Sequence, residues 1–563
     1  MKVIIVGGVA GGATAAARIR RLDEHAEITV YERSGYISYA NCGLPYYIGD
    51  VITDPEELTL QTPESFFKRF RINMKIHHEV ISIHPECKTV SVKNLENGEI
   101  FEENYDKLIL SPGAKPTQPR LPGVGIDKIF TLRTLEDTFR IKEYINKNHP
   151  KSAVLAGGGF IGLELAENLR ELGMDVTIVQ RPKQLMNPFD PDMASMIHNE
   201  MRKHGIKLVL GYTVEGFKEK DNGVEVLLKD NPSLQADMVV LAIGVTPDTV
   251  LAKEAGLELG IKESIVVNDR METSVPDIYA AGDAVQVKHY VTGNDALISL
   301  AGPANKQGRI IADNICGGDS RYLGSQGSSV IKVFDMTAAT TGINETNAKK
   351  SGLEVDTVIL SPMSHAGYYP GGKVMTMKVV FEKESYRLLG AQIIGYEGVD
   401  KRIDVLATAI HAGLNATQLK DLDLAYAPPY SSAKDPVNMA GFMIDNIAKG
   451  TLKQWHLEDM DKISKDKDVV LLDVRTVGEF SRGHIDGFKN IPVDELRERI
   501  SEIEKGKPVY LICQSGLRSY IASRILEGNG YETYNFSGGF RFYDAVVNDR
   551  ALIERAYACG MDY

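Results

Sequence analysis

Two of the five cysteines lie in settings that favour chemistry at sulfur. Cys513 ends an apolar, strand-like stretch and begins a loop, Gln514 to Arg518, that leads into a helical pattern. The amides of such a loop and the Arg518 guanidinium converge on the sulfur, where they stabilise a thiolate or a persulfide. Cys42 has no second cysteine in the residues that follow it, so redox work there needs an external sulfur partner. Taken alone, each cysteine is also compatible with a small buried apolar residue.

Glycine-rich turns follow two apolar stretches and predict two nucleotide sites. The first turn contains Gly7, Gly8, Gly11 and Gly12, with Val9 in place of the middle glycine, and the second contains Gly157, Gly159 and Gly162. At such turns, helix N-terminal amides and the missing Cβ atoms let a pyrophosphate approach the backbone. Glu32 ends the strand after the first turn, where a carboxylate can accept both hydroxyls of an adenosine ribose.

The second nucleotide unit carries a different residue at the position that corresponds to Glu32. Gln180 stands there, followed by Arg181 and Lys183. A neutral side chain beside cations does not repel a 2′-phosphate, although surface cations are often merely solvated. We therefore expect the protein to accept NADPH as well as NADH.

The elements around these turns predict an α/β chain with two Rossmann-like domains. Lys2–Glu32 and Ser152–Gln180 each read as strand, glycine turn, helix and strand. Strand-rich segments and a helical pattern over Lys401–Ala412 predict a separate α+β domain further along. A polar stretch then precedes short strands and expected helices over Val493–Glu504 and Ser519–Gly528, which predict a last α/β module.

Gly282 and Asp283 end a strand-like segment that follows Thr273, and in this element the chain resembles the two-dinucleotide flavoprotein disulfide reductases. The resemblance covers about Met1–Gly450. It implies FAD held in part through Asp283, NAD(P)H at the second glycine turn, and a homodimer. The implied domains are a discontinuous FAD domain at 1–115 and 245–321, an NAD(P)H domain at 116–244, a dimerisation domain at 322–450, a linker at 451–467 and a last domain at 468–563.

The segment SYANCGLPY at 38–46 resembles the single-cysteine branch of that family, the coenzyme A disulfide reductases, with Tyr39 as a mild departure. The resemblance implies that Cys42 forms a mixed disulfide with coenzyme A. Implied coenzyme A contacts are Thr14, Arg18, Arg21, Ser38, Asn41, Asn305 and Lys434, with Arg71 near but not aligned with a family lysine. Arg18 and Arg21 also share one helix face, which suits phosphate binding and equally suits a solvated face.

Two tyrosine-bearing segments, HAGYYPG at 365–371 and AYAPPY at 425–430, resemble family segments that reach the active site from the partner subunit. By position, Tyr368 and Tyr426 are the residues whose hydroxyls would donate a proton to a leaving thiolate. The resemblance also puts Glu164 near the nicotinamide. Without the resemblance, the two tyrosines would be interpreted as interface or core aromatic residues.

The C-terminal part carries LDVR at 472–475, EF at 479–480, GHI at 483–485 and CQSGLRS at 513–519. Together these motifs resemble a rhodanese domain. The resemblance implies that Cys513 takes up sulfane sulfur and passes it to coenzyme A, or to Cys42 by way of coenzyme A.

Composition limits the remaining classes of function. The net charge of −12 gives no field that would attract nucleic acid or an anionic membrane. No apolar run approaches the roughly 20 residues of a membrane span, and we expect no signal peptide. Five widely spaced cysteines without a CxxC motif favour free thiols in a cytoplasmic protein over disulfides or a metal site, and we interpret Cys87, Cys316 and Cys559 as structural or incidental.

These observations and resemblances lead to one main hypothesis and two alternatives. We expect an FAD-dependent NAD(P)H oxidoreductase that reduces coenzyme A disulfide, coenzyme A persulfide or polysulfide at Cys42, with sulfur transfer at Cys513. One alternative is an NADH oxidase or peroxidase in which Cys42 cycles through a sulfenic acid, although Ala10 stands where peroxidase relatives have a histidine. The other is a non-catalytic sulfur carrier or redox sensor.

Overall fold

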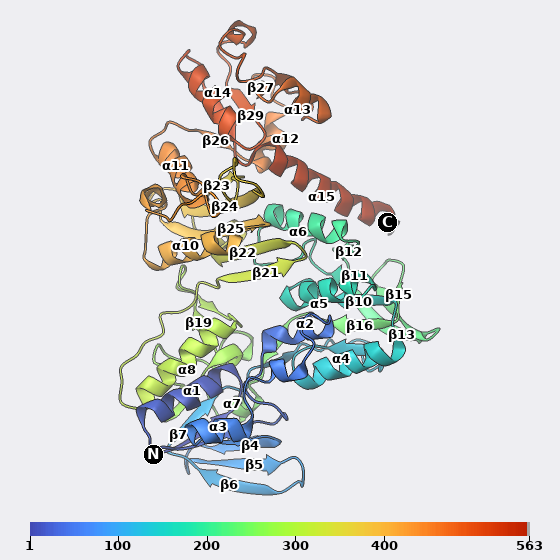
Figure 1. Ribbon diagram of the computed structural model, residues 1–563, viewed down its shortest axis with the longest axis vertical. Coiled ribbons are helices and arrows are strands. Elements are labelled where there is room, and N and C mark those ends of the chain that lie inside the picture. The colour runs from blue at the N-terminus through green and yellow to red at the C-terminus, as the bar shows by residue number, and fades with distance from the viewer. Residues whose placement is uncertain (560–563) are drawn as a thin grey trace. The chain divides into compact units, whose positions relative to one another are not determined.

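The computed structural model describes the backbone of residues 1–559 and the side chains as far as Arg555. The chain forms two compact units (Figure 1). The first comprises Met1–Arg181 and Ile206–Gly327, and the second comprises Pro182–Gly205 and the chain from Ser328 onward. Among the described residues, no helix is both long and apolar enough to cross a membrane.

The first unit begins with a five-stranded parallel sheet in the order β18-β7-β1-β2-β3. Its strands are β1 (Lys2–Val6), β2 (Glu27–Tyr31), β3 (Asn73–Lys75), β7 (Lys107–Leu110) and β18 (Ile278–Ala280). β1 pairs in parallel with β2 and is joined to it through helix α1 (Ala10–Leu22), which confirms the first predicted βαβ unit. Because β18 comes from much later in the chain and pairs with β7, this sheet is discontinuous in sequence.

The second βαβ unit is confirmed in a parallel sheet in the order β12-β11-β10-β16-β9. Its strands are β9 (Ile129–Thr131), β10 (Ser152–Ala156), β11 (Asp175–Gln180), β12 (Lys207–Leu210) and β16 (Met238–Leu241). The helices that belong to this part are α4 (Leu135–Asn148) and α5 (Phe160–Glu171). The first unit also holds two three-stranded antiparallel sheets. One contains β4 (His78–His84), β5 (Thr89–Asn94) and β6 (Ile100–Asn104), and the other contains β13 (Val214–Lys220), β14 (Gly223–Leu228) and β15 (Leu234–Ala236). Two two-stranded antiparallel sheets pair β8 (Ala114–Pro116) with β17 (Val245–Pro247) and β19 (Val287–Lys288) with β20 (Asp295–Ala296).

The second unit holds an antiparallel sheet in the order β21-β22-β25-β24-β23, as the strand-rich pattern predicts. Its strands are β21 (Ser329–Val333), β22 (Met336–Gly342), β23 (Val355–Leu360), β24 (Met375–Glu382) and β25 (Leu388–Gly395). The predicted helix over Lys401–Ala412 is confirmed as α10 (Val399–His411), whose buried face includes Val399, Ile403 and Leu406. Helix α11 (Pro436–Ala448) follows, begun by Asp435, whose side chain accepts from the Val437 amide.

A last parallel sheet, in the order β26-β30-β29-β27-β28, also lies in the second unit. Its strands are β26 (Gln454–Trp455), β27 (Val470–Asp473), β28 (Lys489–Asn490), β29 (Val509–Ile512) and β30 (Thr533–Phe536), with helices α14 (Leu517–Glu527) and α15 (Gly539–Cys559). β26 falls within the segment 451–467 that we expected to be a linker, so part of that segment is an edge strand. The helix expected over Val493–Glu504 is wrong: this stretch forms successive turns and a short 3-10 helix at Ile500–Glu502.

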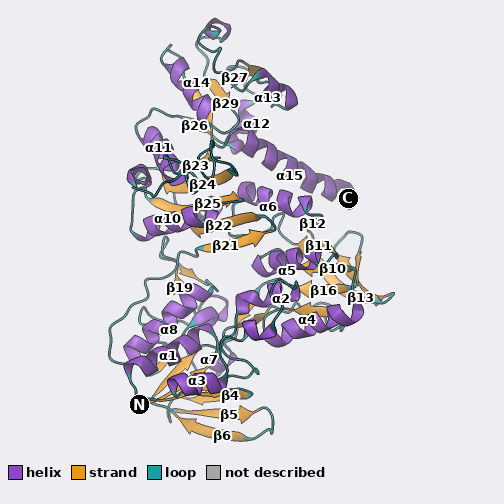
Figure 2. Ribbon diagram, in the orientation of Figure 1, coloured by secondary structure: helices purple, strands orange, loops and turns teal. Residues whose placement is uncertain are grey.

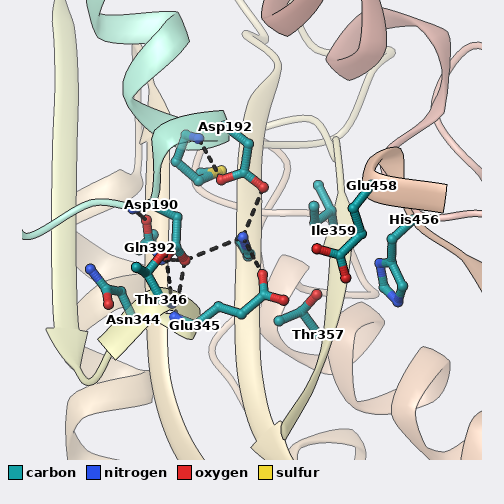
Figure 3. A network of polar contacts seen from close by, with 12 residues as sticks. Asp190, Asp192, Asn344, Glu345, Thr346, Thr357, Ile359, Gln392, His456 and Glu458 are labelled. Atoms are coloured by element: carbon teal, nitrogen blue, oxygen red, sulfur yellow. Dashed lines mark hydrogen bonds and ion pairs between the residues drawn. The ribbon is translucent and has the colours of Figure 1, made fainter. Parts of the chain in front are cut away.

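Helix α6 (Pro191–Lys203) lies between β11 and β12 in the chain but packs within the second unit, because buried charges tie it to the antiparallel sheet. The Lys378 ammonium of β24 lies 3.2 Å from Asp190, 2.8 Å from Asp192 and 2.7 Å from Glu345 (Figure 3). Burial alone would lower the pKa of Lys378, but the three carboxylates raise it. A buried cation of this kind is stable only with such partners, so these residues fix the start of α6.

Candidate active sites

The first glycine turn is too tight for side chains at Gly7 and Gly12. Gly7 has a φ of +96°, and a Cβ there would lie 2.1 Å from a main-chain oxygen, while a Cβ on Gly12 would lie 1.9 Å from the Gly7 oxygen. The Glu32 carboxylate accepts from the Gly8 amide at 2.8 Å, so the predicted ribose-binding side chain sits beside the turn. A tight turn, a helix N-terminus and an adjacent carboxylate fit an adenine dinucleotide.

The second glycine turn repeats this arrangement. Gly157 has a φ of +119°, a Cβ on Gly162 would lie 2.1 Å from the Gly157 oxygen, and a Cβ on Gly159 would meet nothing within 4 Å. That open side is where a phosphate can approach the backbone. Gln180 takes the place of Glu32, and its Oε1 accepts from the Gly158 amide at 3.0 Å. The two turns therefore share these contacts and differ in charge at the position predicted to bind the ribose.

Asp283 lies where the structure brings β18 to the first sheet. Its carboxylate pairs with Arg133, with Nη2 and Oδ2 2.6 Å apart, and the Gly282 amide donates to Gln307 at 2.7 Å. Gly282 has a φ of +83°, so the turn that presents Asp283 favours glycine. Sequence spacing could not reveal Arg133, because 150 residues separate it from Asp283.

Cys42 lies in a short 3-10 helix (Asn41–Gly43) that continues into α2 (Leu44–Ile48). Helix α2 packs closely on α5, where a Cβ on Gly49 would lie 2.1 Å from the Asn168 side-chain oxygen. Cys42 is exposed to solvent, yet the surrounding protein partly desolvates its sulfur. This desolvation and the Glu164 carboxylate raise the pKa of the Cys42 thiol, while Arg133 acts in the opposite direction.

Glu164 is the most strongly perturbed carboxyl near Cys42. Burial, together with the neighbouring Glu167 carboxylate, raises the pKa of Glu164 to about 7. A carboxyl that titrates near neutral pH can exchange a proton under working conditions, which is a common property of functional sites. Its influence on Cys42 puts the second nucleotide domain's helix α5 beside the candidate nucleophile.

Two of the residues implied for coenzyme A binding, Thr14 and Asn305, contact each other between α1 and α8 (Ala301–Ile315), which lie side by side in Figure 2. Thr14 Oγ1 donates to Asn305 Oδ1 at 2.6 Å, and Arg18 Nε lies 2.7 Å from the Asp313 carboxylate. Arg18 is therefore already paired. Arg21, one turn further along α1, is exposed and is the freer cation for a phosphate.

The other residues implied for coenzyme A binding lie in separate segments of the chain. Ser38 has a φ of +44° in the segment that leads to Cys42, and Asn41 begins the 3-10 helix. Arg71 caps the end of α3 (Pro63–Phe70) in a left-handed conformation, with its guanidinium 5.2 Å from the centre of the Phe67 ring. Lys434 is exposed in a loop of the second unit. The structure therefore does not bring Lys434 and the α1 residues into one described unit.

Tyr368 and Tyr426 meet in the second unit although 58 residues separate them. Their hydroxyl oxygens are 2.7 Å apart, and the hydrogen bond with Tyr368 raises the pKa of Tyr426. Both side chains are largely open to solvent, with 76% and 45% exposure. Two phenols that share a hydrogen bond can hold and donate a proton as a pair.

Cys513 follows β29 and is 1% exposed. The Gly516 amide donates to its sulfur at 3.1 Å and the Ser519 hydroxyl donates at 3.2 Å. Gly516 has a φ of +100°, which turns the loop so that its amide faces the sulfur. These two donors stabilise negative charge on the sulfur. The sequence did not identify Ser519 as a donor, although it is the last residue of the CQSGLRS motif.

Arg518 makes a two-point contact with Glu479, with both N···O distances 2.7 Å. This hydrogen bonding to Arg518, with help from Thr476, lowers the pKa of Glu479 to about 2. Arg518 therefore lies near Cys513, and Glu479 both holds its guanidinium in place and balances its charge. The EF motif at 479–480 contains Glu479 but does not indicate that its carboxylate lies opposite Arg518.

The remaining cysteines have no comparable setting among the residues with described side chains. Cys87 is exposed and Cys316 is partly buried, and the structure gives neither of them a hydrogen-bond donor to its sulfur. The side chain of Cys559 lies outside the described residues.

Comparison with known proteins gives three family matches. Residues 1–308 match the pyridine nucleotide-disulphide oxidoreductases, residues 328–436 match the dimerisation domain of that group, and residues 456–545 match the rhodanese-like domain. Coenzyme A disulfide reductase of Staphylococcus aureus (strain JH9) is 38% identical over 442 residues, which cover 78% of this chain and 99% of the relative.

Two solved structures resemble the chain over nearly its whole length. One is reduced CoADR-RHD of Bacillus anthracis, with 48% identity, a TM-score of 0.95 and 98% of each chain covered. The other is an NAD-dependent persulfide reductase from A. fulgidus, with 38% identity, a TM-score of 0.90, and coverage of 96% of this chain and 100% of that one.

Proposed function

The chain belongs to the pyridine nucleotide-disulphide oxidoreductases and carries a rhodanese-like domain, and from this premise we propose that it reduces coenzyme A disulfide and coenzyme A persulfide. As a member of this family it is a flavin-dependent NAD(P)H oxidoreductase, and bound FAD and NAD(P)H supply the two electrons of the reduction. The observation that carries the proposal is the exposed, free Cys42 with the buried Glu164 carboxyl close enough to raise the pKa of its thiol.

The chemistry at Cys42 is thiol–disulfide exchange. The Cys42 thiolate attacks one sulfur of coenzyme A disulfide, the S–S bond of the substrate breaks, and one coenzyme A thiolate leaves. The product is a Cys42–coenzyme A mixed disulfide. Two electrons and a proton then return Cys42 to its thiolate and release the second coenzyme A as a thiol. Because the residues after Cys42, Gly43 to Tyr47, include no second cysteine, coenzyme A itself takes the role of the second thiol.

We propose that the protein works as a homodimer in which Tyr368 and Tyr426 serve the partner subunit's Cys42. The match of residues 328–436 to a dimerisation domain supports this, as do exposed aromatic side chains on that domain. They are Tyr368, Tyr369, Tyr426 and Tyr430. Exposed aromatic side chains, two of them in contact, are typical of an interface that another chain covers.

Cys513 would carry sulfane sulfur between a donor and coenzyme A. A coenzyme A thiolate attacks the outer sulfur of the Cys513 persulfide, which forms coenzyme A persulfide and releases the Cys513 thiolate. Reduction at Cys42 then yields coenzyme A and sulfide. The amide of Gly516 and the hydroxyl of Ser519 support this role, because they stabilise negative charge on sulfur.

Substrate and nucleotide binding follow the residues already described. We propose Thr14, Arg18, Arg21, Ser38, Asn41, Asn305 and Lys434 as coenzyme A contacts, with Arg71 a weaker candidate. Gln180 and Arg181 would allow both NADH and NADPH. The four cysteines with described side chains are free, which supports a reducing, cytoplasmic location.

Trapping the mixed disulfide tests this proposal. The NADH-reduced protein is incubated with coenzyme A disulfide and the mass of the intact chain is measured without further reductant. We expect one coenzyme A adduct in the native protein and in Cys87→Ser, whose thiol is also exposed, and none in Cys42→Ser. An adduct that survives Cys42→Ser contradicts the assignment.

A further inference from the structure

One buried arginine contacts both loops that carry the tyrosine pair. Residues 361–374 join β23 to β24, and residues 422–435 lead into α11. Arg402, on α10, is 1% exposed. Its Nη2 donates to Ser364 O of the first loop at 2.9 Å, and to Tyr430 O of the second loop at 3.3 Å. One guanidinium group therefore spans the two loops.

Asp435 fixes the guanidinium in turn. Arg402 Nη2 lies 3.0 Å from the Asp435 carboxylate, which also accepts from the Ser431 hydroxyl at 2.8 Å and from the Val437 amide at 3.0 Å. The charge on Arg402 is thus neutralised inside the domain, at the start of α11. A buried pair with this many additional hydrogen bonds holds one geometry well.

The two loops also bond directly to each other, because the Ala366 amide donates to Ser431 O at 3.0 Å. At the exposed ends of the loops, the Tyr368 and Tyr426 hydroxyls are 2.7 Å apart. A hydrogen bond between two solvent-exposed hydroxyls contributes little free energy, since water competes for both groups. The alignment of the phenols must therefore come from the backbone beneath them.

We propose that Arg402 is a positioning residue that aligns the Tyr368–Tyr426 pair for proton donation to the leaving coenzyme A thiolate, an inference that rests on the proposed function. One phenol gives its proton to the thiolate, which becomes a thiol. The resulting phenolate accepts a hydrogen bond from the other phenol until solvent returns the proton. This step moves one proton from the phenol to the thiolate and transfers no electrons.

The number of contacts explains why the residue is arginine. Arg402 donates to Ser364, Tyr430, Ser431, Gly398 and Asp435. A guanidinium has five N–H donors in a planar fork, whereas a lysine ammonium has three on a flexible stem. Nη2 alone contacts both loops, while Nε and Nη1 bond to Asp435 and Gly398 and hold Nη2 in place. Arg402→Lys therefore keeps a charge opposite Asp435 but loses the contacts that fix the donor between the two loops.

A double-mutant cycle with Arg402→Lys and Tyr426→Phe tests the proposal. Turnover is measured with coenzyme A disulfide or coenzyme A persulfide, whichever the native protein reduces faster. General-acid groups contribute about 100-fold or more, so we expect Tyr426→Phe to lower kcat to that extent and Arg402→Lys to lower it about 10-fold. In the Tyr426→Phe background, Arg402→Lys should change kcat less than about 2-fold, because the pair through which it acts is already broken.

Two controls separate positioning from general damage to the fold. Reduction of a one-electron dye by NADH needs no protonated leaving thiolate, so Arg402→Lys should leave it unchanged. Asn438→Ala removes another buried side chain of the domain, which donates to Leu419 O and to Leu422 O, the first residue of the second loop, and makes no hydrogen bond to Arg402 or to either tyrosine. It should lower thermal stability with little change in kcat.

Multiplicative effects in the cycle, or equal losses in the dye reaction, would overturn the role of Arg402. Failure of the native protein to reduce either coenzyme A substrate would instead contradict the proposed function. The two failures are therefore distinguishable.

Discussion

Glu164 should make the protein less stable at alkaline pH than at acid pH, and Glu164→Gln should remove that difference. Burial and Glu167 raise the pKa of Glu164 from 4.5 to about 7. Below pH 4.5 the carboxyl is protonated in both the folded and the unfolded chain, so it has no effect on stability. Between pH 4.5 and 7 the unfolded chain loses this proton first, so the free energy of unfolding falls, and the loss is complete above pH 7.

The size of the effect follows from the shift in pKa. A shift from 4.5 to about 7 corresponds to about 3 kcal/mol at pH 8, and to about 1 kcal/mol at pH 5. Glutamine has nearly the same shape but does not ionise. Glu164→Gln should therefore raise the free energy of unfolding by about 3 kcal/mol at pH 8 and much less at pH 5.

Urea unfolding at the two pH values, with saturating FAD and no nicotinamide nucleotide, measures this difference. Glu171→Gln is the matched control, because Glu171 lies on the same helix but is exposed. It should have the same small effect at both pH values. A gain in Glu164→Gln that is equal at pH 5 and pH 8 would refute the reasoning.

Three further predictions concern the other sites. Cys513→Ser should abolish sulfur transfer from a persulfide donor and leave coenzyme A disulfide reduction intact, as parallel assays would show; loss of both activities would argue against separate sites. Hydrogen bonding to Arg518 lowers the pKa of Glu479 to about 2, so this pair stabilises the fold above pH 4.5 and loses its effect as the pH falls towards 2. After allowance for solvent screening, Glu479→Gln should cost about 1 kcal/mol at pH 7, with a smaller difference at pH 3 in thermal unfolding. Arg181→Ala should raise the KM for NADPH more than the KM for NADH, and a protein that turns over no NADPH at all would contradict the assigned role of Arg181.

Local sequence patterns predicted the elements that bury a regular face. Both βαβ units and helix α10 follow from runs of apolar residues and from glycine at the turns. The stretch 493–504 misled because Val493, Leu496 and Ile503 are buried at spacings of three and seven residues, which fit turns as well as a helix. β26 has only two residues, too few for any periodicity, and its sole signal is the buried Trp455.

The contacts around the sites could not be predicted in the same way, because their partners are distant in the chain. Arg518 and Glu479 are 39 residues apart, and Arg402 and Tyr430 are 28 apart. Spacing identifies residues that share a helix face or a loop, and it carries no information about which loops meet. The motifs therefore located Cys42, Cys513 and the tyrosines, while the charges that fix them required the structure.

Steady-state turnover with a panel of acceptors tests the central claim most directly. NADH or NADPH oxidation and sulfide release are followed with coenzyme A disulfide, coenzyme A persulfide and hydrogen peroxide, in the native protein and in Cys42→Ser. We predict rapid turnover of both coenzyme A substrates, one sulfide released for each nucleotide oxidised with the persulfide, and loss of both reactions in Cys42→Ser. Turnover with peroxide alone would contradict the account and identify a peroxidase instead.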